Sequence, residues 1–274
     1  MRCLAALMFA TLVGAPLGAQ DAREIVRKSV ELDQANWLRM KDYTWTATET
    51  ERGLDSKGQA KSERTNQWET VVLYGEPHRR MLERDGKPLT PDQQRKEQQK
   101  LDTAVAKLAR ETDAQRERRL AEQEKQREKD RDFLREVTDL YELKIEGEDK
   151  IDGQDVWVIS ATPKPGYVPK RRDARPLLKI QGRIWIDKRE YQWVRIEAET
   201  TGTISYGLFL ARLNAGAKLL FEQTRINDEV WLPKFERVSG SGRLGLVKKI
   251  ALEQDLTWSN YKKFQVDSKI IATQ

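Results

Sequence analysis

A long series of strand-like segments joined by short turns is the feature that most restricts the fold of this chain. From residue 141 to residue 258, segments rich in β-branched and aromatic residues alternate with turns such as Ile151-Asp152-Gly153. Strands joined by short turns pair antiparallel with their sequence neighbours, so this half of the chain predicts an antiparallel meander. The expected strands cover residues 141–149, 155–162, 178–187, 193–200, 204–212, 217–226, 230–238 and 244–258.

The first part of the chain adds a helix and further strands. Residues 21–41 carry their apolar side chains largely on one stripe, which predicts an amphipathic helix. Residues 43–49, 67–74 and 78–84 then have strand patterns, which brings the expected total to about ten or eleven strands. Open sheets rarely stay flat beyond about ten strands, so this sheet must curl, and helices can cover its concave side. The predicted fold class is α+β, a curved antiparallel sheet forming an incomplete β-barrel.

A charged block interrupts the strands between residues 90 and 140. Thr90 and Thr112 are each followed three residues later by a glutamine, which is the pattern of a helix start. They predict helices at 91–110 and 113–140. Between residues 120 and 133 the helix has a single apolar residue, Ala121, so this part should project into solvent or contact a partner. We interpret residues 90–140 as a helical insertion within a single domain that spans residues 20–274.

The N-terminus predicts export. Residues 1–19 have the pattern of a signal peptide, with Arg2, an apolar segment from Leu4 to Val13, and small residues before the expected cleavage site. After residue 20, no segment approaches the roughly 20 apolar residues that a membrane-spanning helix needs. Cys3 would leave with the signal peptide, and a thiol-free chain suits an oxidising compartment. We therefore expect a periplasmic protein.

The composition argues against most catalytic chemistry. One cysteine and one histidine are too few for zinc clusters, disulfide scaffolds or Cys–His dyads, and His78 at a strand start is interpreted as structural. Phosphate-binding, dinucleotide-binding and nucleophile-elbow motifs do not occur. The net charge is +6, but acidic residues are interleaved throughout the helical block, which does not favour nucleic acid. We predict a non-catalytic protein with neither a metal nor a cofactor.

Three stretches carry a family resemblance. Residues 38–42 lead directly into Tyr43-Thr44-Trp45-Thr46-Ala47, residues 182–188 are followed by Trp193-Val194-Arg195-Ile196-Glu197, and residues 230–234 read Val-Trp-Leu-Pro-Lys. These stretches resemble the LolA/LolB superfamily of bacterial lipoprotein-sorting and lipid-carrying proteins. The resemblance covers most of the chain after residue 20, except the charged helical block. It implies a LolA-like incomplete barrel, helices on its concave side and a hydrophobic cavity for acyl chains.

Alternation along the central strands selects candidate cavity residues. Trp157 and Ile159 should share one sheet face, and Val156 and Val158 the other. Both faces are thus apolar, and a face that no helix covers needs a second cover or a ligand. The alternative is that the inserted helices and long loops cover both faces and leave no cavity. The cavity candidates are Trp157, Ile159, Trp185, Trp193, Leu208 and Phe209.

A basic loop from Lys164 to Arg175 is a candidate for contacts with lipid headgroups. It has five basic residues and a single acid, Asp173. Bases near an anionic membrane surface are attracted to it, so the loop could make a peripheral membrane contact. The alternative is an ordinary surface loop. The headgroup or rim candidates are Lys170, Arg171, Arg172 and Arg175.

Two hypotheses for function follow. The first is an exported, non-catalytic carrier-like protein of the cell envelope that holds the acyl chain of a lipid or lipoprotein in an apolar cavity. The second is an envelope scaffold or sensor that binds a protein partner through its charged helical arm. The two differ in whether the sheet itself binds a ligand or serves as a support.

Overall fold

The computed structural model describes residues 21–74, 76–206, 211–244 and 248–263. Their helices are α1 (Ala22–Met40), α2 (Pro91–Ala109), α3 (Asp113–Leu140) and the short 3-10 helix η1 (Arg175–Lys179). The helices expected in the charged block are therefore confirmed. The strands are β1 (Tyr43–Leu54), β2 (Ala60–Leu73), β3 (Glu76–Arg84), β4 (Lys87–Pro88), β5 (Tyr141–Ile151), β6 (Gln154–Pro163), β7 (Ile180–Asp187), β8 (Trp193–Thr200), β9 (Ile204–Tyr206), β10 (Ala211–Leu213), β11 (Lys218–Ile226), β12 (Val230–Leu244) and β13 (Lys248–Lys263).

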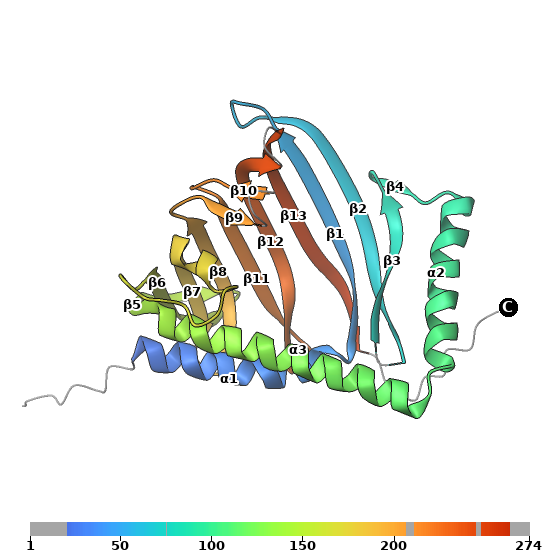
Figure 1. Ribbon diagram of the computed structural model, residues 1–274, viewed down its shortest axis with the longest axis horizontal. Coiled ribbons are helices and arrows are strands. Elements are labelled where there is room, and N and C mark those ends of the chain that lie inside the picture. The colour runs from blue at the N-terminus through green and yellow to red at the C-terminus, as the bar shows by residue number, and fades with distance from the viewer. Residues whose placement is uncertain (1–20, 75, 207–210, 245–247, 264–274) are drawn as a thin grey trace, which may run out of the picture.

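The described strands form one curved antiparallel sheet that is not closed into a barrel (Figure 1). Its order is β4-β3-β2-β1-β13-β12-β11-β8-β7-β6-β5, and β9 and β10 join it through β12. Sequence neighbours pair in most places, as the short turns predict. The pairing of β1 with β13 joins the two ends of the described chain, from Tyr43 opposite Lys263 to Gly53 opposite Leu252. This long-range pairing places the first strand in the middle of the sheet.

One expected strand is not continuous. Instead of a single strand at 204–212, the structure has β9 and β10, two three-residue strands that pair with each other. A run of apolar residues has no alternation that would reveal a reversal of the chain, so the sequence prediction was wrong here. Leu208 and Phe209, two of the cavity candidates, lie outside the described residues.

Helix α1 packs on one face of the sheet, which we call the inner face; the opposite face is the outer face. The helix begins at Asp21, whose carboxylate accepts a hydrogen bond from the Arg23 backbone N–H at 3.0 Å. Its other end is tied to β12, because Asn36 Nδ2 donates to the Trp231 carbonyl at 2.8 Å and Asn36 Oδ1 accepts from the Trp231 N–H at 2.7 Å. Both hydrogen bonds are buried, so α1 is held in one position on the sheet.

Helix α3 runs beside α1 (Figure 1), and Arg23 of α1 forms an ion pair with Asp139 of α3. Both α2 and α3 start with the expected capping boxes, at Thr90 and Thr112. Arg127 places its guanidinium 4.6 Å from the centroid of the Trp37 ring. The buried residues of α3 lie near its C-terminal end, whereas most of its first half is exposed. This agrees with the expectation that the charged segment is not part of a core.

None of the helices in the described part of the chain combines the length and the apolar character needed to cross a membrane.

Candidate functional site

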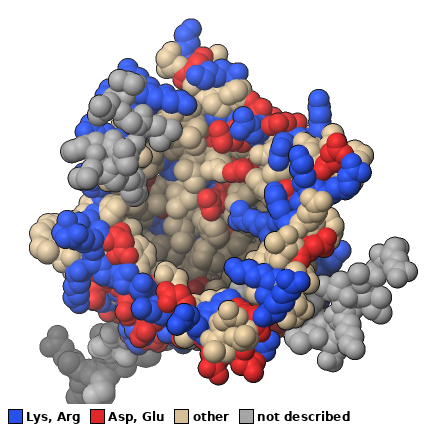
Figure 2. All heavy atoms as spheres, turned by 45° about the vertical axis from the view of Figure 1, so that its right-hand side comes forward, with Lys and Arg blue, Asp and Glu red and all other residues tan. Residues whose placement is uncertain are grey.

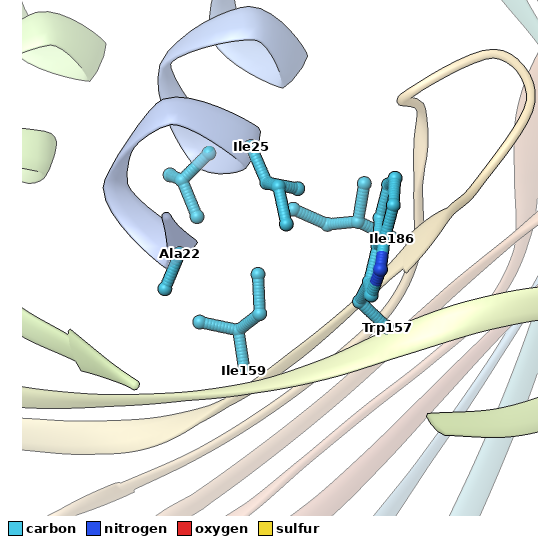
Figure 3. Close-up of a cluster of buried hydrophobic side chains, with 6 residues drawn as sticks. Ala22, Ile25, Trp157, Ile159 and Ile186 are labelled. Carbon is cyan, nitrogen blue, oxygen red and sulfur yellow. The ribbon is translucent and has the colours of Figure 1, made fainter. Parts of the chain in front are cut away.

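The inner face has a covered part, where α1 forms a hydrophobic core with the sheet. Ile25 of α1, which is completely buried, packs against Trp157, Ile159 and Ile186 of β6 and β7 (Figure 3). Ala22 and Val26 of α1 complete this cluster. Leu143, Ile184, Tyr191 and Trp193 pack around it and are only partly buried. The covered part is therefore filled by the side chains of this chain itself.

The inner face continues well beyond α1. Residues that lie directly opposite each other on paired strands share a sheet face. Starting from the covered Ile159, the register links these residues across β6, β7, β8, β11, β12, β13 and β1: Ile159, Ile184, Ile196, Phe221, Glu236, Leu256 and Glu49. A second row on the same face lies two residues along each strand from the first. It links Ala198, Leu219, Val238 and Gln254.

Aromatic rings form a second connection across the same face. Trp193 and Phe221 have ring centroids 4.9 Å apart, and Phe221 and Trp258 have centroids 6.0 Å apart. Trp258 lies opposite Ala47 of β1, which in turn lies opposite Trp68 of β2. Tilted ring pairs at these distances are favourable, and they line up aromatic surface from β8 to β2.

We call six of these residues the open apolar patch. Each is only partly buried, although it lies on the same face as the fully buried Ile159. The helices pack mainly elsewhere, α1 on β5, β7 and β12, and α2 on β3. The apolar inner face is thus longer than its helical cover. The open apolar patch consists of Ile196, Leu219, Phe221, Val238, Leu256 and Trp258.

Figure 2 shows the corresponding hollow. Its floor is formed mainly by residues that are neither basic nor acidic, and its rim carries many Lys, Arg, Asp and Glu side chains. The outer face of the same strands bears charged residues such as Glu197, Arg237 and Asp255. We therefore assign the floor of the hollow to the inner face of the sheet.

Two carboxylates at this surface have raised pKa values. Glu236 lies between Phe221 and Leu256, and burial raises its pKa. The structure gives Glu236 no hydrogen bond or ion pair to any described residue. Asp33 of α1 accepts a hydrogen bond from Trp193 Nε1 at 3.3 Å, and burial raises its pKa as well. Both groups indicate that the surface around them is poorly solvated.

Two further hollows have a different character. One, of about 560 Å³, lies between α2 and β3 and is bounded by Glu97, which accepts a hydrogen bond from the Met81 N–H at 3.3 Å. The other, of about 600 Å³, lies on the outer face and is lined largely by polar and charged side chains. There Arg183 Nε lies 2.7 Å from a Glu146 oxygen. The outer hollow is therefore not suited to an apolar ligand.

The cavity candidates do not form one group in the structure. Trp157 and Ile159 are buried beneath α1 and belong to the core. Trp185 lies on the outer face, in a separate cluster with Val156, Val194 and Trp231, as its alternation with Ile184 and Ile186 requires. Trp193 lies at the boundary between the α1 core and the open apolar patch. Of the described candidates, Trp193 is thus the one that adjoins the hollow.

The basic candidates lie together, in the loop after β6 and at the first residue of η1, but they differ in their contacts. Arg171 pairs with Asp173, at 2.7 Å between Nη2 and Oδ2. Lys170 Nζ lies 3.7 Å from Asp139 Oδ2, and its side chain is highly exposed. Arg172 and Arg175 are exposed, and their side chains have no hydrogen-bond or ion-pair partner among the described residues. No hydrogen bond, ion pair or ring contact between described residues joins these side chains to the open apolar patch.

The sequence prediction missed most of the patch. Leu219, Phe221, Val238 and Leu256 lie on strands that were expected, and Val238 and Leu256 alternate with polar neighbours such as Arg237 and Asp255. This alternation was the available signal. Selecting candidates by tryptophan content instead favoured Trp157 and Trp185, which the fold buries on opposite faces.

Comparisons with known proteins were made by sequence and by structure. Neither protein-family models nor curated proteins give a match. Similar solved structures include an outer membrane lipoprotein-sorting protein domain from Vibrio parahaemolyticus (13% identity, 89% of this chain and 95% of that chain covered, TM-score 0.37). They also include a LolA-superfamily protein from Nitrosomonas europaea (13% identity, 92% and 97% covered, TM-score 0.28).

At these TM-scores, function has to be inferred from this chain's own residues. The described residues form the open, curved antiparallel sheet with an N-terminal helix on one face that a LolA-like fold implies.

Proposed function

We propose that this protein binds an apolar ligand, the acyl chain of a lipid or lipoprotein, on the open apolar patch. The observation that carries the proposal is that the apolar inner face extends past α1, so that Phe221, Leu256 and their neighbours remain partly exposed. Large exposed apolar surfaces in a concave setting are typical of binding sites. Each methylene group that is buried contributes about 0.8 kcal/mol, so apolar walls are sufficient to hold such a chain.

The proposed mechanism is passive. The ring faces of Phe221 and Trp258, together with the neighbouring aliphatic side chains, remove the acyl chain from water, and no bond is made or broken. Helix α1 closes one end of the inner face by its buried hydrogen bonds to β12. The hollow would therefore accept a chain from the side that α1 leaves open.

Adjacent residues of β11 provide a matched test. Leu219 lies on the inner face and Leu220 on the outer face, and both are partly buried leucines. Leu219→Gln should weaken binding of a fluorescent fatty-acid probe by about tenfold, because an amide replaces apolar contact area. Leu220→Gln is the control and should bind the probe as the unmodified protein does. Probe titration of both purified variants, with circular dichroism to verify folding, measures the difference.

Two results would contradict the proposal. One is equal probe binding by the two variants. The other is protein that is consistently free of lipid by mass spectrometry after purification and that does not bind the probe.

A second candidate function rests on α3. The first half of this helix is largely exposed, including Leu120. A protein partner could bind this arm while the sheet acts as a support. Replacing residues 91–135 by a short linker should then abolish association with that partner and leave binding of the fatty-acid probe unchanged. Loss of probe binding in the same variant would instead indicate that the arm helps to form the hollow.

A further inference from the structure

The loop between β6 and η1 exposes an apolar side chain. Val168 is 81% exposed, the highest value among the large apolar residues that the structure describes. It lies between Pro165 and Pro169, which restrict the backbone on either side. A single exposed valine is unremarkable on a protein surface. The neighbours of Val168 distinguish it from such a residue.

The loop is fixed to the C-terminal end of α3. The Lys164 N–H donates to the Leu140 carbonyl at 2.9 Å, and Lys164 Nζ donates to the Asp139 carbonyl at 2.6 Å. On the other side of Val168, the Lys170 N–H donates to the buried Glu136 carboxylate at 2.5 Å. The tip of the loop is therefore held from both sides, and Val168 remains exposed without being part of a core.

Positive charge surrounds this tip. Arg171 pairs with Asp173, but Arg172 and Arg175 are exposed, and their side chains have no hydrogen-bond or ion-pair partner among the described residues. The side chain of Lys170 is 78% exposed and reaches Asp139 only at 3.7 Å. The surface around Val168 therefore carries more positive than negative charge.

We propose that this loop docks the protein on an anionic lipid surface. Val168 enters the headgroup region, and Lys170, Arg172 and Arg175 contact the negatively charged headgroups. An apolar tip flanked by bases is the combination that favours the interface of an anionic bilayer. With one apolar side chain and three bases, the binding is weak and reversible. The proposal stands apart from acyl-chain binding, because no hydrogen bond, ion pair or ring contact among the described residues links the loop to the open apolar patch.

Co-sedimentation with lipid vesicles tests whether this loop docks on anionic lipid. The full chain should sediment with vesicles of phosphatidylcholine mixed with phosphatidylglycerol, and much less with pure phosphatidylcholine. Each base near an anionic surface strengthens binding by about fivefold, so Arg172→Glu with Arg175→Glu should lower the partition coefficient by at least about 25-fold. Val168→Ser should lower it by about fivefold through lost apolar burial. Higher salt should weaken binding of the unmodified protein.

A charge-matched control lies on α3. Arg118 and Lys125 are exposed, and Arg118→Glu with Lys125→Glu changes the net charge by the same amount. The proposal is supported if this control keeps the partition coefficient of the unmodified protein while the loop variants lose theirs as expected. Equal loss in both charge variants, or no difference between the two vesicle types, overturns it. All variants should bind the soluble fatty-acid probe normally, so a failure of membrane docking is distinguishable from a failure of the apolar site.

Discussion

Asn36 joins α1 to the sheet through two buried hydrogen bonds with the backbone of Trp231. Replacing it by alanine leaves a buried N–H and a buried carbonyl without a partner, and each such group costs about 1–3 kcal/mol. We expect Asn36→Ala to lower the free energy of unfolding by about 3 kcal/mol in urea titrations.

The control for this prediction is Asn214→Ala. It removes an exposed hydrogen bond of 2.9 Å to Ser241 Oγ and should cost less than about 1 kcal/mol. Equal losses in the two variants would show that the contact with Trp231 does not hold α1 in place.

Glu236 makes stability depend on pH with a definite sign. Burial raises its pKa above the ordinary value of 4.5, so the folded protein favours the neutral carboxyl more than the unfolded chain does. The stability that the neutral Glu236 carboxyl contributes is present below pH 4.5 and is lost as the pH rises through the raised pKa. We expect Glu236→Gln to be more stable than the unmodified protein at neutral pH, and this gain should shrink toward about pH 4.

Urea unfolding across this pH range measures the difference between the two proteins. Asp33 has a pKa shifted in the same direction, but it is present in both proteins and does not enter the difference. Glu197→Gln, on the exposed outer face, is the control and should show no such trend. If Glu236→Gln raised the free energy of unfolding equally at every pH, the raised pKa of Glu236 would not be the cause of the gain.

At the scale of elements, α1 divides the inner face into a core and a site. Ile25 is completely buried beneath the helix, whereas Ile196 lies on the same face and is partly exposed. The same substitution should therefore have different effects at the two positions. Ile25→Ala should lower the free energy of unfolding by about 2–5 kcal/mol, because it leaves a cavity in the core.

Ile196→Ala should cost about 1 kcal/mol, since less apolar area is lost at a partly exposed position, and it should weaken binding of the fatty-acid probe. Urea unfolding and probe titration of both variants compare the two parts of the face. If Ile196→Ala destabilised the protein as strongly as Ile25→Ala without changing probe binding, the open apolar patch would be core instead.

At the scale of the whole molecule, local patterns in the sequence predict the helices and strands, but they do not predict which part of the sheet a helix covers. The capping threonines predict α2 and α3, and alternation correctly separates Trp157 from Val156. The pairing of β1 with β13 and the extent of α1 over the sheet depend on contacts between distant parts of the chain, which no local pattern encodes. For that reason the sequence could place Trp157 on the same face as Ile159, while the burial of Trp157 beneath α1 could not be predicted.

The two faces of the sheet should also respond to acid in opposite ways. On the outer face, Arg52 contacts Glu63, Glu253 and Asp255, and Asp255 also pairs with Arg237, so this ionic network joins β2, β1, β13 and β12. Arg237 and Arg52 lower the pKa of Asp255 below its ordinary value of 3.8. The stability that Asp255 contributes is therefore present above pH 3.8 and is lost as the pH falls through the lowered pKa, opposite in sign to Glu236.

Asp255→Asn should accordingly lower the free energy of unfolding by about 1–2 kcal/mol at neutral pH, because charge-assisted hydrogen bonds from two arginines are weakened. The loss should shrink as the pH falls below 3.8, where Asp255 itself becomes protonated. Asp149→Asn, at an exposed position bonded to its neighbour Lys150, is the control and should have little effect at any pH. Urea unfolding of both variants across this pH range measures the difference. If the stability lost in Asp255→Asn did not depend on pH, the network would stabilise the sheet through the packing of its side chains rather than through charge.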